Sequence, residues 1–153
     1  MRQMWIKLLL LSLCLALPFA SAQAQSDEAF LQYRQKLMQT IGATMGSIGQ
    51  ILKNKLPFSG HIATHANDLN QLSKLIPDAF KKKITAGRTD AKPNVWKDWD
   101  KFVAASKQLG KESAKLAKVT SRADMAAKMK VVGASCGGCH EPFRRPKEKR
   151  FKR

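Results

Sequence analysis

The chain has little that would favour β-structure. It contains a single tyrosine, few runs of β-branched residues, and no Asn-Gly or Asp-Gly pair between alternating apolar segments. Residues that favour helices, namely alanine, leucine, lysine, methionine and glutamine, dominate instead. The composition therefore predicts an all-α protein.

Long apolar runs are also lacking. The apolar stretch at residues 8–17 is too short to cross a bilayer as a helix. It follows the basic residues Arg2 and Lys7 and precedes the small-residue stretch 20–24, an order typical of a secretory signal peptide. We therefore expect cleavage after Ala24 and export to the periplasm, with no stable membrane insertion.

Cysteines are few, and one of the three is expected to be lost. Cys14 lies in the predicted signal, which leaves only Cys136 and Cys139. Removal of the first 24 of the 153 residues leaves 129, residues 25–153, which is the size of one domain. No disulfide framework is possible if both remaining sulfurs form thioethers.

Acidic residues number 11 against 28 basic ones, so the formal net charge is +17. It falls by two, to +15, when Arg2 and Lys7 leave with the signal. Such a charge attracts acidic proteins, anionic lipids or nucleic acid. Export and the lack of a recognition motif argue against nucleic acid. An acidic redox partner and a solvated basic surface without a specific partner remain as alternatives.

The motif Cys136-Gly137-Gly138-Cys139-His140 carries the chemistry. On a helix, Cys136, Cys139 and His140 share one face. Two thiols at this spacing can add to the vinyl groups of one covalent haem c, and the imidazole can then be an axial ligand of the iron. The first alternative is a redox dithiol, but such motifs usually stand in a βαβ context, which this sequence lacks. The second is half of a zinc site, but the other histidines lie far upstream.

Apolar residues at helical spacing predict four helices and an antiparallel up-down-up-down bundle. Pro77 and Pro93 bound a long connection, and the basic tail from about residue 144 is expected to be frayed or disordered. The expected helices cover residues 26–53, 60–76, 94–116 and 121–140.

In this topology the motif lies beside the first half of the first helix. Met38 is about 18 Å and Met45 about 28 Å from the start of that helix, whereas His140 is within about 10 Å of the end of the last one. Met38 is therefore the better candidate for the sixth iron position. Arg34 is a charge on the same apolar stripe, which a haem propionate would explain.

These residues resemble class II cytochromes c, the cytochrome c′ family. The resemblance rests on Tyr33-Arg34-Gln35, on Val132–Cys136 running into the motif, and on Phe143-Arg144, which it places near the haem. It implies a four-helix bundle, of which cytochromes c′ are a known example. It also makes an antiparallel homodimer possible.

The resemblance implies two functions that divide on one residue. Low-spin members carry methionine at the position of Met38 and transfer electrons. Five-coordinate members carry a bulky apolar residue there and bind nitric oxide or carbon monoxide. Because the position holds methionine, we expect electron transfer through a low-spin haem with His140 and Met38 as axial ligands, and no enzymatic activity. The five-coordinate gas-binding protein is the alternative, and an adaptor without haem is the third hypothesis.

Overall fold

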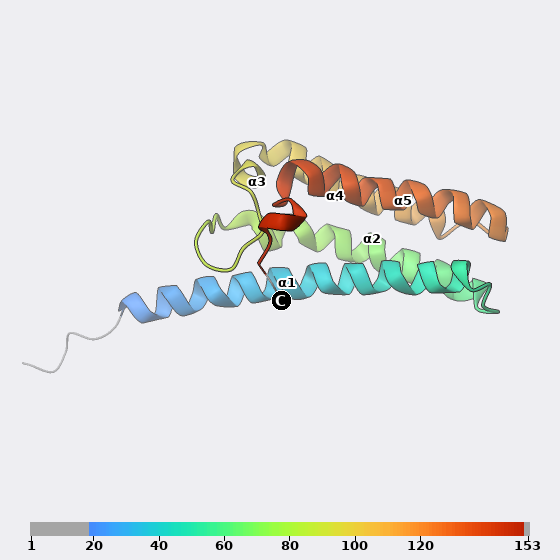
Figure 1. Cartoon of the computed structure of the whole chain (residues 1–153), viewed down its shortest axis with the longest axis horizontal. Helices are drawn as coiled ribbons and strands as arrows, with labels where there is room; N and C mark the ends of the chain where they lie inside the picture. The colour runs from blue at the N-terminus through green and yellow to red at the C-terminus, as the bar shows by residue number, and fades with distance from the viewer. Residues whose placement is uncertain (1–18, 152–153) are drawn as a thin grey trace, which may run out of the picture.

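The computed structural model of the chain describes residues 19–151, which are almost entirely helical (Figure 1). Within this range the only β-type pairing is an isolated antiparallel bridge between Ala91 and Arg144. The all-α prediction is therefore confirmed. The helices are α1 (Phe19–Lys53), α2 (Ser59–Lys81), α3 (Asn94–Lys97), α4 (Trp99–Leu116), α5 (Arg122–Phe143) and the 3-10 helix η1 (Lys147–Lys149).

The four long helices run antiparallel to their sequence neighbours, as predicted, and form a four-helix bundle (Figure 1). Helix α2 packs along α1 and α4, and α4 packs along α5. Within residues 19–151, α1 and α5 are not among the closely packed pairs, although they are next to each other around the bundle. A gap between them follows from this arrangement.

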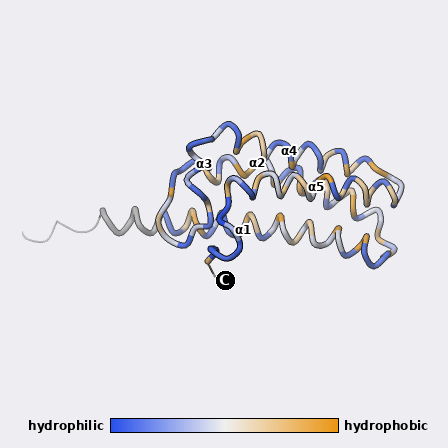
Figure 2. The backbone as a smooth tube through the Cα atoms, turned by 45° about the horizontal axis from the view of Figure 1, so that its top comes forward, coloured by the Kyte–Doolittle hydropathy of each residue, from blue (hydrophilic) through white to orange (hydrophobic). Residues whose placement is uncertain are grey.

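The core consists of the apolar stripes of the four helices, which turn inward (Figure 2). A fully buried aliphatic side chain of this kind stabilises the fold by about 1.5–3 kcal/mol. The largest fully buried apolar side chains are Ile48, Ile62, Leu69, Val95, Leu116 and Val132. None of the helices in residues 19–151 combines the length and apolar character needed to cross a membrane.

Helix α1 begins at Phe19, seven residues before the expected start at Ser26. Alanine and glutamine in residues 20–25 favour helix, so in the chain with its first 24 residues still attached nothing delays the start of the helix to Ser26. The basic and apolar parts of the predicted signal peptide, with Cys14, lie outside the described residues. Cleavage after Ala24 stays a prediction.

Helix α2 continues through Pro77 to Lys81, so the predicted end at Ile76 is wrong. The proline removes one backbone donor, but two contacts stabilise the turn that follows. Ala79 is buried, and Arg34 of α1 donates to the carbonyl oxygens of Ala79 (2.7 Å) and Lys82. Tertiary contacts thus override the local helix-breaking signal, and the connection shortens to residues 82–93.

Helices α2 and α4 approach each other closely at Gly110. A Cβ atom there would lie 2.4 Å from the Ser73 hydroxyl oxygen. The Asn70 side-chain amide donates to the Gly110 carbonyl oxygen at 3.1 Å, and Ser73 donates to the Asn70 carbonyl oxygen at 2.7 Å. Only glycine allows this spacing, which fixes how near the two helices lie.

Helix α5 begins as predicted and ends later than predicted. The Ser121 hydroxyl accepts from the backbone N–H of Asp124 at 3.1 Å, which is an N-cap. The helix continues through Pro142 to Phe143, and the Arg144 N–H still donates to the His140 carbonyl oxygen at 2.9 Å. The Cys136–His140 motif therefore lies inside the helix, one turn before its end.

Candidate haem site

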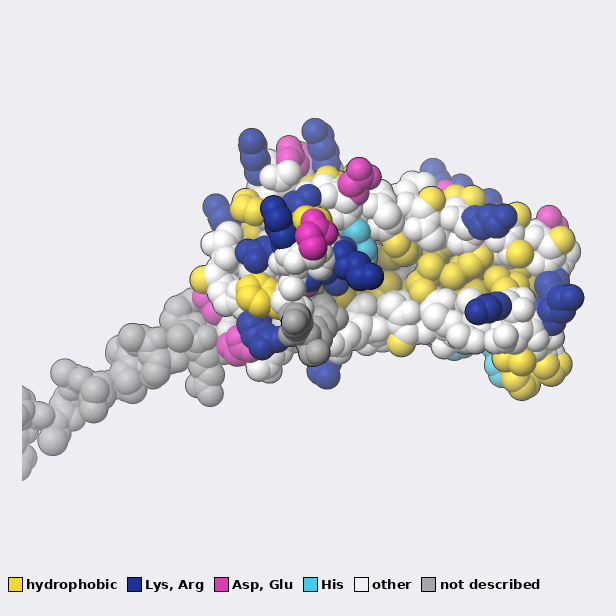
Figure 3. Space-filling view, viewed as in Figure 1, with side chains coloured by type: hydrophobic (Ala, Val, Ile, Leu, Met, Phe, Trp, Pro, Cys, Tyr) yellow, Lys and Arg dark blue, Asp and Glu magenta, His cyan; other side chains and the backbone are white. Residues whose placement is uncertain are grey.

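The gap between α1 and α5 opens into a cavity of about 470 Å³. Figure 3 shows it as a groove floored by apolar side chains, with lysine and arginine side chains at one end. Helices α2 and α4 form its back wall with Ile76, Phe80, Phe102 and Leu109. Cavities of this size and apolar character commonly take a cofactor.

The α5 wall of the cavity carries the predicted motif. Cys136, Cys139 and His140 all line it, as the helical spacing predicts. Val132, one turn before Cys136, is fully buried, so this face of α5 turns to the bundle interior. Gly137 and Gly138 are exposed on the other side of the helix, and a Cβ atom would meet nothing within 4 Å at either position. The two glycines do not position the thiols.

The electrostatics of the motif argue against a redox dithiol. Burial raises the pKa of the Cys136 thiol, and burial together with the neighbouring Cys136 raises the pKa of the Cys139 thiol to about 11. Reactive redox cysteines have a lowered pKa instead. His140 keeps exposed surface, but the partial desolvation of its imidazole, and then the charges of Arg144 and Arg150, lower its pKa, which favours the neutral form with a lone pair for a metal.

The zinc alternative lacks ligands among the described residues, where no three histidine, cysteine, aspartate or glutamate side chains gather around one point. His61 stacks on the Phe58 ring at 5.1 Å, and His65 lies 3.9 Å from the Asp68 carboxylate. Neither histidine lines the cavity. In residues 19–151, His140 is the only cavity-lining imidazole.

The α1 wall lies opposite the motif and includes Met38, Gly42 and Met45. Both methionines are partly buried and pack against the core. Met38 and Met45 both line the same cavity, so their distances from the start of α1 do not decide which of them lies nearer the motif. Met38 is placed where a wall residue or a ligand would be.

Arg34 is the buried charge of the site, with 3% of its surface exposed. Its Nε and Nη2 atoms bond the end of α2, and its guanidinium lies 4.9 Å from the Phe80 ring centre. Its Nη1 atom is buried and has no hydrogen-bond partner within the described part of the chain. Because Arg34 lines the cavity, this atom suits an anionic group held there, as a haem propionate would be. The role stays a prediction.

Arg144 also lines the cavity, at the end of α5. Its Nη2 atom lies 3.9 Å from an Asp90 carboxylate oxygen, and its backbone pairs with Ala91. This position agrees with the prediction that Arg144 lies near the haem. What Arg144 does there stays a prediction. The pairing holds the loop at residues 88–91 against the end of α5.

Sequence reasoning missed this loop and the last described residue. Arg88, Thr89, Asp90 and Ala91 line the cavity, and so does Phe151 of the C-terminal tail. The unusual length of the connection after α2 was the one signal for the loop, because long connections often carry function. The predicted frayed tail is wrong for residues 144–151, because Arg145 and Phe151 bond to Asp90 of the loop.

The residues present fit a covalently attached haem c. They supply two neutral thiols on one helical face, a neutral imidazole one residue later, apolar walls, and a buried unpaired guanidinium nitrogen. Cys136 and Cys139 would form the thioethers, and His140 would be the proximal ligand. These three assignments remain the prediction made from the motif.

Comparisons with known proteins agree with this fit. Residues 29–144 match the family model described as Cytochrome C′. The cytochrome c′ of Rhodospirillum rubrum is 33% identical over 80% of this chain and 86% of its own. That of Pararhodospirillum photometricum is 34% identical over 78% and 98%. The nitric oxide complex of a cytochrome c′ variant from Alcaligenes xylosoxidans superposes with a TM-score of 0.68, at 27% identity over 78% of this chain and 97% of that one.

The expectation of electron transfer through a low-spin haem, with Met38 as a second axial ligand besides His140, is wrong. The two relatives named above are cytochromes c′, and the Alcaligenes protein holds nitric oxide, which agrees with the five-coordinate alternative. The physical reason for the error is that a methionine on the buried stripe of a helix packs in the same way whether or not it binds a metal. The match over residues 29–144, the bundle and the haem-binding motif together establish that the chain belongs to the cytochrome c′ family and carries covalent haem c.

Proposed function

We propose that the protein is a five-coordinate haem protein that binds nitric oxide or carbon monoxide. The observation that carries the proposal is the asymmetry of the cavity. One wall offers an imidazole, His140, whereas the α1 wall opposite offers none: besides Arg34 and Gln35 it consists of Leu31, Met38, Ile41, Gly42 and Met45. The bound haem would supply an iron with a free coordination position, which small neutral ligands can take.

The surrounding residues favour such ligands over charged or large ones. The back wall contains Phe80 and Phe102, whose ring centres lie 5.2 Å apart, and Phe143 meets Phe102 edge-on at 5.3 Å. This aromatic cluster excludes water and offers no hydrogen-bond donor along its faces. A neutral diatomic molecule loses little hydration on binding here, whereas an anion would lose much.

In this proposal Met38 is part of the wall. Its thioether is flexible and polarisable and fills irregular space beside the cavity. Leucine has a similar volume, and such exchanges usually cost less than about 1.5 kcal/mol. Met38→Leu should therefore leave both stability and haem coordination nearly unchanged.

The test is the absorption spectrum of the reduced, purified holoprotein with and without carbon monoxide. A five-coordinate haem gives a high-spin spectrum that shifts on addition of carbon monoxide, and Met38→Leu should behave in the same way. A low-spin reduced spectrum that ignores carbon monoxide in the wild type, and becomes sensitive in Met38→Leu, would overturn the proposal.

We also propose that the protein acts in the periplasm by binding rather than by turnover, after removal of the first 24 residues. Support comes from the order of basic, apolar and small residues at the start of the sequence. A mature N-terminus at Gln25, measured by mass spectrometry of the purified holoprotein, would agree. The net charge further favours an acidic protein partner, whose association should weaken with salt.

A further inference from the structure

The C-terminal tail reaches one end of the haem cavity. After α5 ends at Phe143, the chain turns toward α1, and the last described residues lie beside that helix (Figure 1). The family match ends at residue 144, so residues 145–151, called the C-terminal strap here, lie beyond it. Phe151 of the strap lines the cavity, while 39% of its surface stays exposed.

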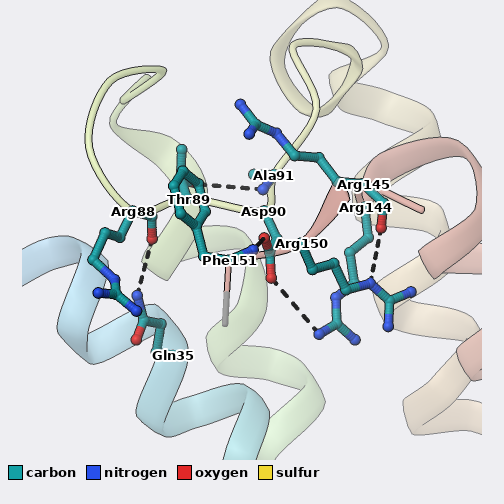
Figure 4. Close-up of polar contacts among 9 residues, drawn as sticks. All are labelled: Gln35, Arg88, Thr89, Asp90, Ala91, Arg144, Arg145, Arg150 and Phe151. Atoms are coloured by element: carbon teal, nitrogen blue, oxygen red, sulfur yellow. Dashed lines mark hydrogen bonds and ion pairs between the residues drawn. The ribbon is translucent and has the colours of Figure 1, made fainter. Parts of the chain in front are cut away.

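Asp90 bonds to both ends of the strap, and Figure 4 shows its side-chain contact with Phe151. Its carbonyl oxygen accepts from the Arg145 N–H at 2.8 Å, where the strap begins. Its side-chain Oδ1 atom accepts from the Phe151 N–H at 3.1 Å, where the described strap ends. One loop residue therefore holds both the start and the end of the segment.

The strap is also bonded within itself. The Arg150 Nε donates to the Arg145 carbonyl oxygen at 2.9 Å, and the Arg145 guanidinium lies 5.4 Å from the Phe151 ring centre (Figure 4). The single turn η1 lies between these contacts. These bonds give the strap one closed shape that directs Phe151 to the cavity.

The loop that carries Asp90 is in turn tied to the rigid helices. The Lys92 N–H donates to the Phe143 carbonyl oxygen at 2.9 Å, and the Lys92 ammonium donates to the Glu141 carbonyl oxygen at 2.8 Å. Gln35 of α1 donates to the Arg88 carbonyl oxygen at 3.0 Å. Asp90 thus has a fixed position between α1 and α5.

We propose that the C-terminal strap closes one end of the haem cavity and slows the access of small neutral ligands, with Asp90 and Phe151 as positioning residues. This inference rests on the proposed function, because it concerns ligands of the same site. The strap is held by few bonds and is largely exposed, so it opens without unfolding of the bundle. The rate of ligand uptake then follows the fraction of molecules in which the strap is open.

The variants separate the contacts. Asp90→Ala removes the side-chain acceptor for the Phe151 N–H together with the carboxylate that pairs with Arg144, and Phe151→Ala removes the ring at the cavity. Asp90→Asn keeps an acceptor, and Phe151→Leu keeps apolar bulk, so both should keep the wild-type rates of carbon monoxide association and of cleavage of the strap. Phe58→Ala is the matched control, because Phe58 is exposed to a similar degree, 46%, and does not line the cavity.

Two measurements use the reduced holoprotein. Carbon monoxide association, followed by flash photolysis, should be about fivefold faster in Asp90→Ala, the population shift expected from the loss of one hydrogen bond. It should also be faster in Phe151→Ala, which loses the ring at the cavity. Trypsin, which cleaves after the basic residues of the strap, should remove it about fivefold faster in Asp90→Ala, as read from the intact mass. Melting temperatures should match the wild type.

The two readouts distinguish the possible failures. Unchanged association rates in variants whose strap is released to trypsin would overturn the closing role. Equal cleavage of the strap in wild type and Asp90→Ala would show that Asp90 does not hold it and would overturn the inference too. A wild type that takes up no carbon monoxide would refute the proposed function instead, and the trypsin comparison would still decide whether Asp90 fastens the strap.

Discussion

Replacing Gly110 by alanine should destabilise the bundle, although alanine is normally the better helix residue. The new Cβ atom would lie 2.4 Å from the Ser73 hydroxyl oxygen, which must move. Ser73 is buried and would give up its 2.7 Å hydrogen bond to the Asn70 carbonyl oxygen. Since α2 and α4 form the back wall, the strain would reach the haem cavity.

The magnitude follows from two opposing effects. A buried hydroxyl without its partner costs about 1–3 kcal/mol, and forced overpacking costs a similar amount if Ser73 stays in place. Alanine recovers about 1 kcal/mol through helix propensity. The net loss for Gly110→Ala should be up to about 2 kcal/mol, which lowers the melting temperature by up to about 8 °C.

Thermal and urea unfolding of the holoprotein, followed by circular dichroism, measure this loss. In a Ser73→Ala background the clash is gone, so adding Gly110→Ala should be neutral or stabilising. The control is Gly46→Ala on α1, where a Cβ atom meets nothing within 4 Å, and it should gain up to about 1 kcal/mol. An equal loss for Gly110→Ala with and without Ser73 would refute the reasoning, as would a gain like that of Gly46→Ala.

Three further predictions concern the site and its support. Cys136→Ala with Cys139→Ala should leave the cavity without haem, and the melting temperature should fall by at least about 4 °C, measured by circular dichroism; an unchanged value would contradict a structural role for the haem. Met45→Leu should leave the reduced spectrum and the carbon monoxide response as in the wild type, and any change in spin state would identify a ligand role. The Lys115 ammonium, 2.7 Å from buried Glu112, lowers the pKa of that carboxyl, so its stabilisation is present above the ordinary glutamate pKa of about 4.3 and is lost as the pH falls through the lower folded pKa. Urea midpoints between pH 6 and 3 should therefore fall less steeply in Glu112→Gln, and parallel curves would speak against the ion pair.

Features that depend on local spacing could be predicted from the sequence. The helical positions of Cys136, Cys139 and His140 require one shared face, and the structure places all three in the cavity. The Ser121 cap is equally local, because donor and acceptor lie three residues apart. Such patterns need no knowledge of the rest of the fold.

Features that depend on distant contacts could not be predicted. Helix α2 passes Pro77 because Arg34 bonds to carbonyl groups 45 and 48 residues away. The tail is held because Asp90 accepts from an N–H 61 residues away. In both cases the sequence shows a helix breaker or a run of charge, and only the fold supplies the partner.

The gap between α1 and α5 also has a consequence for the order of assembly. Every closely packed pair of long helices is adjacent in the sequence: α1 with α2, α2 with α4, and α4 with α5. A chain with such local contacts has a low contact order and is expected to fold fast. The pair that would close the ring, first helix against last, is the one separated by the cavity. The chain can therefore pack these three helix pairs before the haem is attached. Both thiols then stay accessible through the open side between α1 and α5, so attachment does not require the bundle to unfold.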